Sequence, residues 1–225
     1  MNQPIQLDRY RQAAPQLYEV LREQIVTLAL KPGDVLSRVD LARQFGVSQT
    51  PVRDALMKLE QEGLVDVYPQ AATHVSKIDL RAARQAQFLR RAVELELVHQ
   101  HASDKNLQVI QGLNETLTEL DSCLSRQDVT GFMAADRRFH HVLYEHADML
   151  EVWSLLRARS GHIDRLRHLH LPAKGKMQQI IHDHQRIAKA ISAGYPQQAQ
   201  EALRMHLTGT LANAEQIRQD NPDYF

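Results

Sequence analysis

The sequence changes character near residue 78, and this change most constrains how the chain can fold. Before residue 78, turn-forming pairs such as Pro32-Gly33 and Tyr68-Pro69 divide the chain into short segments. After it, apolar residues recur at helical spacing over six long stretches, at about residues 79–102, 104–126, 128–147, 149–170, 175–193 and 196–216. The chain is therefore predicted to be mainly α-helical, with a small N-terminal domain at residues 1–78 and an antiparallel six-helix bundle at residues 79–217. Residues 218–225 are mostly polar and are predicted to form a frayed tail.

The composition excludes several classes of protein. With 225 residues, 43% of them apolar and 24% charged, the chain is long and apolar enough to bury a core. It has no run of about eighteen apolar residues that would span a membrane. Its first residues lack the apolar core of a signal peptide, so the expected location is the cytoplasm. The single cysteine, Cys123, excludes a disulfide framework and a cysteine-based zinc finger.

The N-terminal segment reads as three helices followed by two short strands. Apolar residues at helical spacing mark the first helix, namely Leu17, Leu21, Ile25 and Leu28. Ser37 begins a Ser-x-x-Asp pattern typical of a helix start, and Gly46 ends this second helix. Ser48 is placed to cap a third helix. Strand-like runs at residues 64–68 and 73–76 follow, which completes the pattern of a winged helix-turn-helix.

The third predicted helix carries polar side chains that suit DNA. A helix-turn-helix places the start of its second helix against base edges in the major groove. Arg53 can bind guanine through two hydrogen bonds, and Gln49, four residues earlier on the same face, can bind adenine in the same way. Thr50 and the region of Ser48 suit a phosphate, and Arg38, at the start of the second helix, is placed for the DNA backbone. These five residues are the candidate DNA contacts.

The same residues have a plainer interpretation as a solvated helix face. Residues 1–78 hold nine basic and nine acidic side chains, so this segment has no net positive charge to attract DNA. Helix-turn-helix shapes also occur in proteins that do not bind DNA. The pattern alone leaves both interpretations open.

The segment from Leu36 to Val65 resembles the N-terminal domain of the GntR family of bacterial transcription regulators. The resemblance is carried above all by the Val-Ser-x-Thr-Pro-Val-Arg-x-Ala-Leu core at residues 47–56. It implies DNA contact by four of the candidate residues, Arg38, Gln49, Thr50 and Arg53. Two departures alter the expected base preference and wing contact. Gln49 stands where the family usually has arginine, and Gln70-Ala71-Ala72 replaces the usual Arg-Arg-Gly of the wing.

Histidine is concentrated in the second part of the chain, where eleven of the twelve histidines lie after residue 98. Four polar residues fall within the apolar stripes of three predicted helices: Asp136, His140, His184 and His206. Each costs about 1–3 kcal/mol if it is buried without a partner, and one divalent cation would satisfy all four. Three imidazoles and one carboxylate suit zinc best, with nickel or manganese as alternatives, and disfavour calcium and magnesium.

Each member of this set also has an ordinary explanation. A single histidine on an apolar helix face is usually a hydrogen-bonded core residue, and Asp136 has Arg137 and Arg138 nearby in sequence as ion-pair partners. The remaining histidines of the bundle are predicted to lie on flanks or exposed faces: His99, His101, His141, His146, His162, His168, His170 and His182. Of these, His162 could instead line a cavity together with Arg159.

Over its whole length, the predicted bundle is similar to the FCD domain, the all-helical effector-binding domain of the FadR-like branch of the GntR family. The similarity lies in the Asp-x-x-Phe-His element at residues 136–140 and in the surroundings of His184 and His206. It implies that the four inward polar residues ligate a metal, and that a small organic-acid or sugar-acid effector completes the coordination. It also implies that Arg90 faces the cavity, although Arg90 can equally form an ion pair with Glu94, four residues further on.

These features together predict a sequence-specific transcription regulator, most simply a repressor, that is modulated by a small carboxylate effector. The expected partners are the second copy of a homodimer and a palindromic operator in double-stranded DNA, with no role for a membrane. One alternative is a metal-dependent hydrolase, because three protein ligands and an open position also suit hydrolysis. Against it, the chain has no His-Glu-x-x-His motif and no obvious general base beside the ligands, so no enzyme is expected. Another alternative is a constitutive DNA-binding protein whose metal is purely structural.

Overall fold

The computed structural model describes residues 7–67 and 72–225, and these form two compact units. The first unit comprises the chain up to Asp79 together with Arg218–Phe225. The second comprises Leu80–Ile217. The first unit is therefore discontinuous in sequence. Among the described residues, no helix combines the length and apolar composition that a membrane crossing requires.

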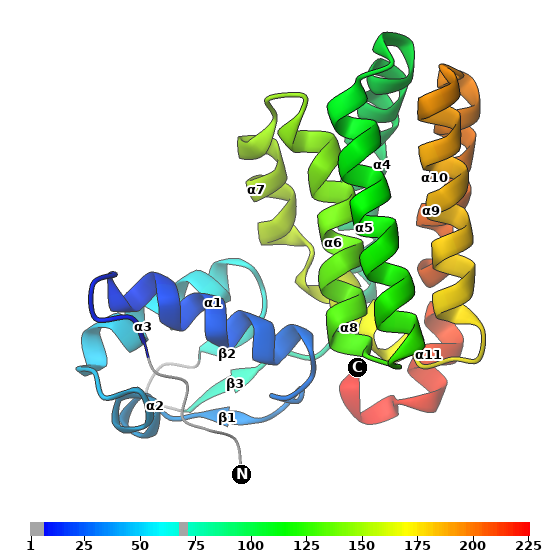
Figure 1. The fold of residues 1–225 in the computed structure, drawn as a ribbon. Helices are drawn as coiled ribbons and strands as arrows, with labels where there is room; N and C mark the ends of the chain where they lie inside the picture. The colour runs from blue at the N-terminus through cyan, green and yellow to red at the C-terminus, as the bar shows by residue number, and fades with distance from the viewer. Residues whose placement is uncertain (1–6, 68–71) are drawn as a thin grey trace. The chain divides into compact units, whose positions relative to one another are not determined.

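The first unit is a winged helix-turn-helix, as predicted (Figure 1). Its elements are α1 (Ala13–Val26), β1 (Val35–Leu36), α2 (Arg38–Phe45), α3 (Gln49–Gln61), β2 (Val65–Val67) and β3 (Thr73–Val75). The three strands form an antiparallel sheet in the order β1-β3-β2. The strand β1 was not expected, because two residues carry no alternating pattern and are placed only by pairing with β3.

Apolar stripes on the helices of the first unit meet in one core. Leu17, Leu21 and Ile25 of α1 are fully buried, and they belong to the same cluster as Val52 and Leu59 of α3. The fourth residue of the predicted α1 stripe, Leu28, lies beyond the end of the helix with a positive φ of 58°. It is nevertheless mostly buried, so the prediction that its side chain lies in the core is confirmed. The predicted end of the helix is wrong, because α1 stops at Val26.

The second unit contains more helices than the six that were predicted. They are α4 (Leu80–Asp104), α5 (Leu107–Ser125), α6 (Val129–Glu145), α7 (Leu150–Arg159), α8 (Gly161–His170), α9 (Lys176–Ala193), α10 (Pro196–Ala212) and the start of α11 (Ala214–Asp220). The predicted helix at 149–170 breaks at Ser160, whose hydroxyl donates to the Arg157 carbonyl and to Asp164. Local hydrogen bonds from a serine side chain compete with the backbone hydrogen bonds of a continuous helix. A serine within a segment of helical periodicity gives no sign in the sequence that it forms them.

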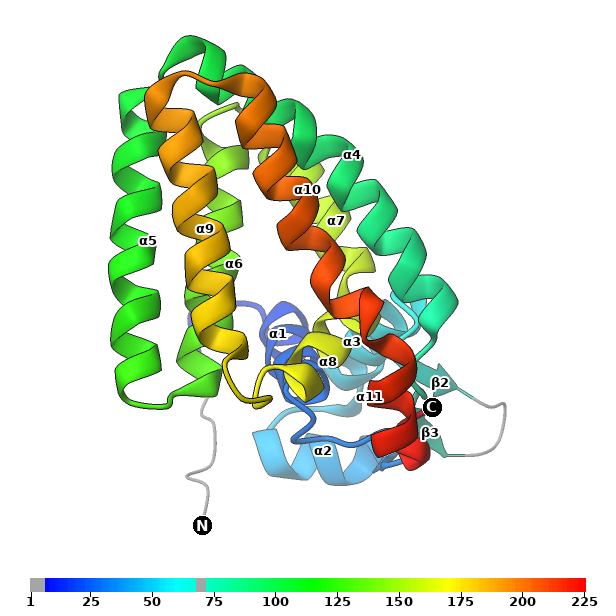
Figure 2. The ribbon, with the colours of Figure 1, turned by 90° about the vertical axis from the view of Figure 1, so that its right-hand side faces the viewer.

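The long helices pack side by side around a common apolar interior (Figure 2). α5 packs against both α6 and α9, and α10 packs against both α4 and α9. Fully buried side chains from four helices fill the middle: Leu113, Phe139, Leu143, Ile187, Ile191 and Leu203. Since α6, α9 and α10 all face this interior, polar residues within their apolar stripes are brought toward one another.

The C-terminal segment is ordered, which corrects the expectation of a frayed tail at residues 218–225. It forms the end of α11 and a short 3-10 turn at Pro222–Tyr224. The backbone N–H of Ile78 donates to the Tyr224 carbonyl at 2.8 Å, and the Lys77 ammonium donates to the Asp223 carbonyl. These partners lie far apart in sequence, so composition near the chain end gave no sign of them. The tail is thus part of the first unit.

Candidate functional site

The connection between α2 and α3 has the geometry of a DNA-reading turn. Gly46 ends α2 with a left-handed φ of 65°, a conformation that costs glycine little. Only Val47 and Ser48 then precede the first residue of α3. The Ser37 hydroxyl accepts the Asp40 N–H at the start of α2, which fixes the other end of the same helix. A short turn of this kind presents the N-terminal end of the following helix to solvent.

All five candidate DNA contacts are exposed. Arg38 begins α2, whereas Gln49, Thr50 and Arg53 lie in the first turns of α3. Ser48 occupies the N-cap position of α3 and its side chain makes no capping hydrogen bond. The first turn of α3 has no acidic residue, so nothing there opposes an approaching phosphate. Contact between these residues and DNA stays a prediction.

The wing can be followed only in part. Ala72 is described and leads into β3. Gln70 and Ala71 lie outside the described residues. The expectation of altered wing contact with DNA therefore stays a prediction drawn from the sequence.

The four inward polar residues of the helical unit lie together. Asp136 and His140 come from α6, His184 from α9 and His206 from α10. Each offers one ligand atom, and these four atoms lie within 4.8 Å of one another. The His206 Nε2 atom is 3.2 Å from both the His140 Nε2 and the His184 Nε2 atoms. Two nitrogens bound to one ion at about 2.0–2.1 Å are themselves about 3 Å apart, so this spacing fits shared coordination.

Unpartnered polar atoms in this cluster also fit a cation. Asp136 Oδ1 is buried without a hydrogen-bond partner among the described residues and lies 3.6 Å from His184 Nε2. The Nδ1 atoms of His184 and His206 also lack such a partner, but they are not the atoms that face the cluster and a cation there would not satisfy them. Buried polar atoms normally have partners, because an unsatisfied one costs about 1–3 kcal/mol. A cation held by the carboxylate oxygen and the three Nε2 atoms would satisfy the atoms that face one another.

Asp136, His140 and His184 are held in the protonation states that metal binding needs. Burial alone would raise the pKa of Asp136, but the Arg167 guanidinium, followed by the nearby imidazoles, holds it well below its ordinary value. Burial, followed by the charge of Arg90, lowers the pKa of His140 to about 4. Burial and the neighbouring His206 lower the pKa of His184 well below its ordinary value. Near neutral pH the carboxylate is therefore ionised, and His140 and His184 keep free lone pairs.

Glu94 of α4 supports this cluster and was missed as such in the sequence. It is fully buried, and its carboxylate accepts from His140 Nδ1 at 2.9 Å, from Arg90 Nε at 2.7 Å and from the Tyr144 hydroxyl at 3.3 Å. Burial alone would raise the pKa of Glu94, but Arg90 and then His140 lower it to about 2. Because a carboxylate only accepts, His140 must carry its proton on Nδ1, which leaves Nε2 facing the cluster. One signal in the sequence could have found it. Glu94 lies three residues before the apolar Leu97, and therefore on the same face of the predicted helix.

Replacing Glu94 should therefore weaken metal binding without removing a ligand. In Glu94→Gln the charge that holds the His140 ring is lost, and the affinity for zinc is expected to fall by about 10–100-fold. Competition with a fluorescent zinc chelator measures this affinity. Glu96→Gln is the matched control, because Glu96 is exposed on the same helix. Equal zinc affinities in the two variants would contradict the supporting role of Glu94.

The ion-pair partner of Asp136 differs from the two arginines that were expected. Arg167 of α8 donates to Asp136 Oδ2. Arg138 instead pairs with Glu119. Residues that follow one another on a helix point to different sides, so sequence proximity alone does not bring an adjacent arginine onto the carboxylate. The second oxygen, Oδ1, stays turned toward the imidazoles.

Two further histidines lie deeper than expected. His101 is buried and donates from Nε2 to the Leu143 carbonyl at 2.8 Å. His162 is also buried, and its Nδ1 lies 2.9 Å from a nitrogen of Arg165. Arg159, which was paired with His162 in the expected cavity lining, is exposed. Both histidines are therefore core residues with protein partners.

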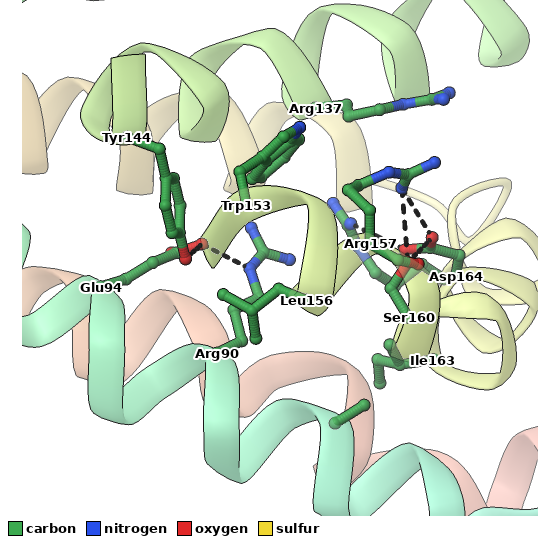
Figure 3. A pocket seen from close by; sticks show the side chains of 12 residues that line it. Arg90, Glu94, Arg137, Tyr144, Trp153, Leu156, Arg157, Ser160, Ile163 and Asp164 are labelled. Atoms are coloured by element: carbon green, nitrogen blue, oxygen red, sulfur yellow. Dashed lines mark hydrogen bonds and ion pairs between the residues drawn. The ribbon is translucent and has the colours of Figure 1, made fainter. Parts of the chain in front are cut away.

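Beside the cluster, α4, α6, α7 and α8 enclose a hollow (Figure 3). The centre of a water molecule can occupy about 30 Å³ within it. Arg90 lies in its wall and is held by Glu94, so the ion pair considered in the sequence and a position facing the cavity are both present. A role for Arg90 in binding an effector stays a prediction.

A winged helix-turn-helix followed by an all-helical domain with an inward histidine cluster is the architecture of a DNA-binding regulator. Comparison with known families agrees. Residues 13–75 match the GntR family of bacterial regulatory proteins, and residues 70–209 match the FCD domain. The chain belongs to the GntR family, carries an FCD domain, and is a DNA-binding transcriptional regulator rather than an enzyme.

Individual relatives support this assignment. The chain is 35% identical over 209 residues to an HTH-type transcriptional regulator in an unstable DNA locus of Streptomyces ambofaciens, covering 93% of this chain and 88% of the relative. It is 28% identical over 220 residues to the HTH-type transcriptional repressor RspR of Escherichia coli, covering 98% and 96%. The fold is similar to the solved structure of E. coli McbR/YncC, with a TM-score of 0.79, 23% identity and coverage of 92% and 98%.

Proposed function

We propose that this chain is a homodimeric repressor whose affinity for a palindromic operator is set by a small carboxylate effector bound at a metal centre. The observation that carries the proposal is the convergence of Asp136, His140, His184 and His206 inside the bundle. Zinc is the first candidate for the metal, and nickel and manganese are the alternatives. RspR, a relative over almost the whole chain, is itself named a repressor, which supports the same sign of regulation here.

The DNA-binding half of the proposal rests on the exposed start of α3. Arg53 is assigned to a guanine edge and Gln49 to an adenine edge, because these side chains match the donor and acceptor pattern of those bases in the major groove. Ser48, Thr50 and Arg38 are assigned to phosphates. A two-fold dimer would present two such helices to half-sites about one DNA turn apart.

The sensing half rests on the surroundings of the cluster. A bound metal would supply a Lewis-acidic position for one carboxylate oxygen of the effector. Arg90 is assigned to the effector carboxylate, since it lines the hollow beside the cluster and a guanidinium can bind a carboxylate through two N–H groups. Arg167 links Asp136 to α8 and also lies 3.6 Å from Asp164. An anion that competes for Arg167 would loosen α8 from α6, and this is the proposed first step of the response.

The proposal is tested by measuring operator affinity with and without acids. Zinc-loaded protein is titrated onto labelled operator DNA, selected from a random pool, in the presence of dicarboxylates and sugar acids. An effector should lower the affinity by about 5–150-fold, which corresponds to a coupling free energy of about 1–3 kcal/mol. If zinc removal lowers the melting temperature but no acid changes operator affinity, the metal is purely structural. Turnover of an ester or amide by zinc-loaded protein would favour the hydrolase instead.

A further inference from the structure

A second hollow, here called the N-terminal hollow, lies in the first unit between the segment that precedes α1 and the end of α2. Three arginines line it, Arg9 and Arg11 in that segment and Arg43 in α2. The centre of a water molecule can occupy about 520 Å³ within it. Pockets that hold ligands measure about 300–1,000 Å³, so the N-terminal hollow is wide enough for a group much larger than water.

The arginines of the N-terminal hollow are exposed and only loosely paired with carboxylates. Arg11 lies 3.6 Å from Glu19, and Arg43 lies 3.2 Å from Asp40. Each of these four side chains is more than half exposed. Ion pairs between exposed side chains contribute little to stability, so an incoming anion can displace the carboxylates.

A buried glutamine fixes the backbone that carries Arg9 and Arg11. Gln16 of α1 is only 7% exposed, and its side-chain oxygen accepts the Asp8 N–H at 2.8 Å. Its side-chain nitrogen donates to the carbonyls of Asp8 at 2.9 Å and of Arg11 at 3.1 Å. Because this backbone is already held in place, its arginines lose less conformational entropy on binding a ligand than they would on a free tail.

The opposite wall of the N-terminal hollow adjoins the DNA-reading helix. Gly46 and Val47 belong to the turn between α2 and α3, and Val47 is two residues before Gln49. Consecutive Cα atoms are about 3.8 Å apart, so this wall lies within about 8 Å of the start of α3. An α-helix with its side chains is about 10–12 Å across and fills a major groove about 12 Å wide. Groups that flank the helix start therefore face the phosphates that border the groove.

We propose that the N-terminal hollow binds the sugar–phosphate backbone of operator DNA, with Arg9, Arg11 and Arg43 as the phosphate contacts. A guanidinium matches a phosphate through two parallel hydrogen bonds. Such contacts supply affinity and register without sequence information. Residues 1–78 hold as many acidic as basic side chains, so their attraction for DNA depends on where the arginines are placed rather than on net charge.

The inference involves neither the metal nor the effector. It rests on the proposed function in one respect, namely that the start of α3 enters the major groove. Arg9, Arg11 and Arg43 then set how strongly the protein holds any DNA, while the exposed start of α3 sets which sequence it prefers.

The salt dependence of DNA binding tests this site. A protein group that neutralises a phosphate releases counter-ions, so each contact adds about 0.9 to the slope of log affinity against log salt concentration. Arg9→Gln, Arg11→Gln and Arg43→Gln are each titrated onto labelled operator at several salt concentrations, with the full chain and fluorescence anisotropy. Arg126→Gln is the matched control, because Arg126 is exposed in the second unit.

Each of the three variants should lower the slope by about 0.9 per bound protomer and weaken binding about three- to tenfold at physiological salt. Operator and a shuffled duplex should be affected by the same factor, because a phosphate contact does not distinguish bases. Arg9→Lys should keep the wild-type slope, since a lysine also neutralises one phosphate. Arg126→Gln should keep both slope and affinity. All variants should keep the wild-type melting temperature, because these side chains are exposed.

Wild-type slopes in all three variants would overturn the inference. A loss confined to operator DNA would also overturn it, because these arginines would then read bases. A change in the sedimentation of the DNA-free variants would assign the N-terminal hollow to contact between two copies of the chain, which contradicts the inference as well.

Arg53→Ala separates this inference from the proposed function. If Arg53→Ala leaves operator affinity unchanged while Arg9→Gln lowers the salt slope, the phosphate site stands and base reading by α3 fails. If Arg53→Ala weakens operator binding while all three slopes stay at the wild-type value, base reading stands and the phosphate site fails.

Discussion

The Arg53→Ala variant is expected to bind operator at least about thirtyfold more weakly than the wild type. Arg53 is exposed near the start of α3, and its nearest charged contact is Asp54 at 3.5 Å, a weak surface pair that DNA can displace. A bidentate arginine–guanine pair is worth about 1–3 kcal/mol, so a dimer that loses both pairs loses about 2–6 kcal/mol. Fluorescence anisotropy with labelled operator measures the change, and the loss should be largest for operators that carry guanine at the contacted position.

The control for this variant removes the same charge elsewhere. Arg126 is exposed in the second unit, so Arg126→Ala alters the net charge equally while leaving α3 intact. It should retain operator affinity within about twofold at physiological salt, where distant surface charges are screened. Both variants should keep the wild-type melting temperature, because neither side chain is buried. Wild-type affinity in Arg53→Ala would show that the start of α3 does not read the operator.

Under the proposed function, the His184→Ala variant is expected to bind much less zinc than the wild type and to lose most of the stabilisation that zinc would provide. A partner that only orients a ligand contributes about 10–100-fold to affinity, so loss of a ligand itself should cost more than about a hundredfold. At a zinc concentration 100 times the wild-type Kd, the stabilisation should fall from about 2.7 to about 0.4 kcal/mol or less. Elemental analysis and melting temperatures with and without zinc measure both effects. Each variant is compared with its own metal-free form, because His184 also stacks on Phe139.

A neighbouring histidine serves as the control. His182 lies on the same helix but is exposed, so His182→Ala should keep both the zinc content and the zinc-dependent rise in melting temperature. The effector response should be lost in His184→Ala and kept in His182→Ala. If His184→Ala held as much zinc as the wild type, the cluster of Asp136, His140, His184 and His206 would not be the ligand set.

Helical periodicity was sufficient to predict which four residues meet inside the bundle. Asp136, His140, His184 and His206 all interrupt apolar stripes, and stripes of packed helices face a common interior. The fold class was equally accessible, since the density of turn signals separates the two units. These patterns are local. They therefore predict the inward face of each helix without knowledge of the angles at which the helices cross.

The hydrogen-bond and ion-pair partners of these residues could not be predicted from helical periodicity. Arg167 pairs with Asp136, and Glu94 supports His140. Both contacts join helices that are distant in sequence, so they depend on how α8 and α4 are placed against α6. The break at Ser160 escaped prediction for a related reason, because it is made by side-chain hydrogen bonds within a periodic segment.

The return of the last eight residues to the first unit affects how this protein can be dissected. A fragment cut after Asp79 would expose the backbone N–H of Ile78, whose acceptor is the carbonyl of Tyr224. The DNA-reading unit is therefore not an excisable N-terminal piece, and an affinity tag fused after Phe225 would be attached to it rather than to the helical domain. A tag at that end belongs behind a cleavable linker whenever operator binding is to be measured.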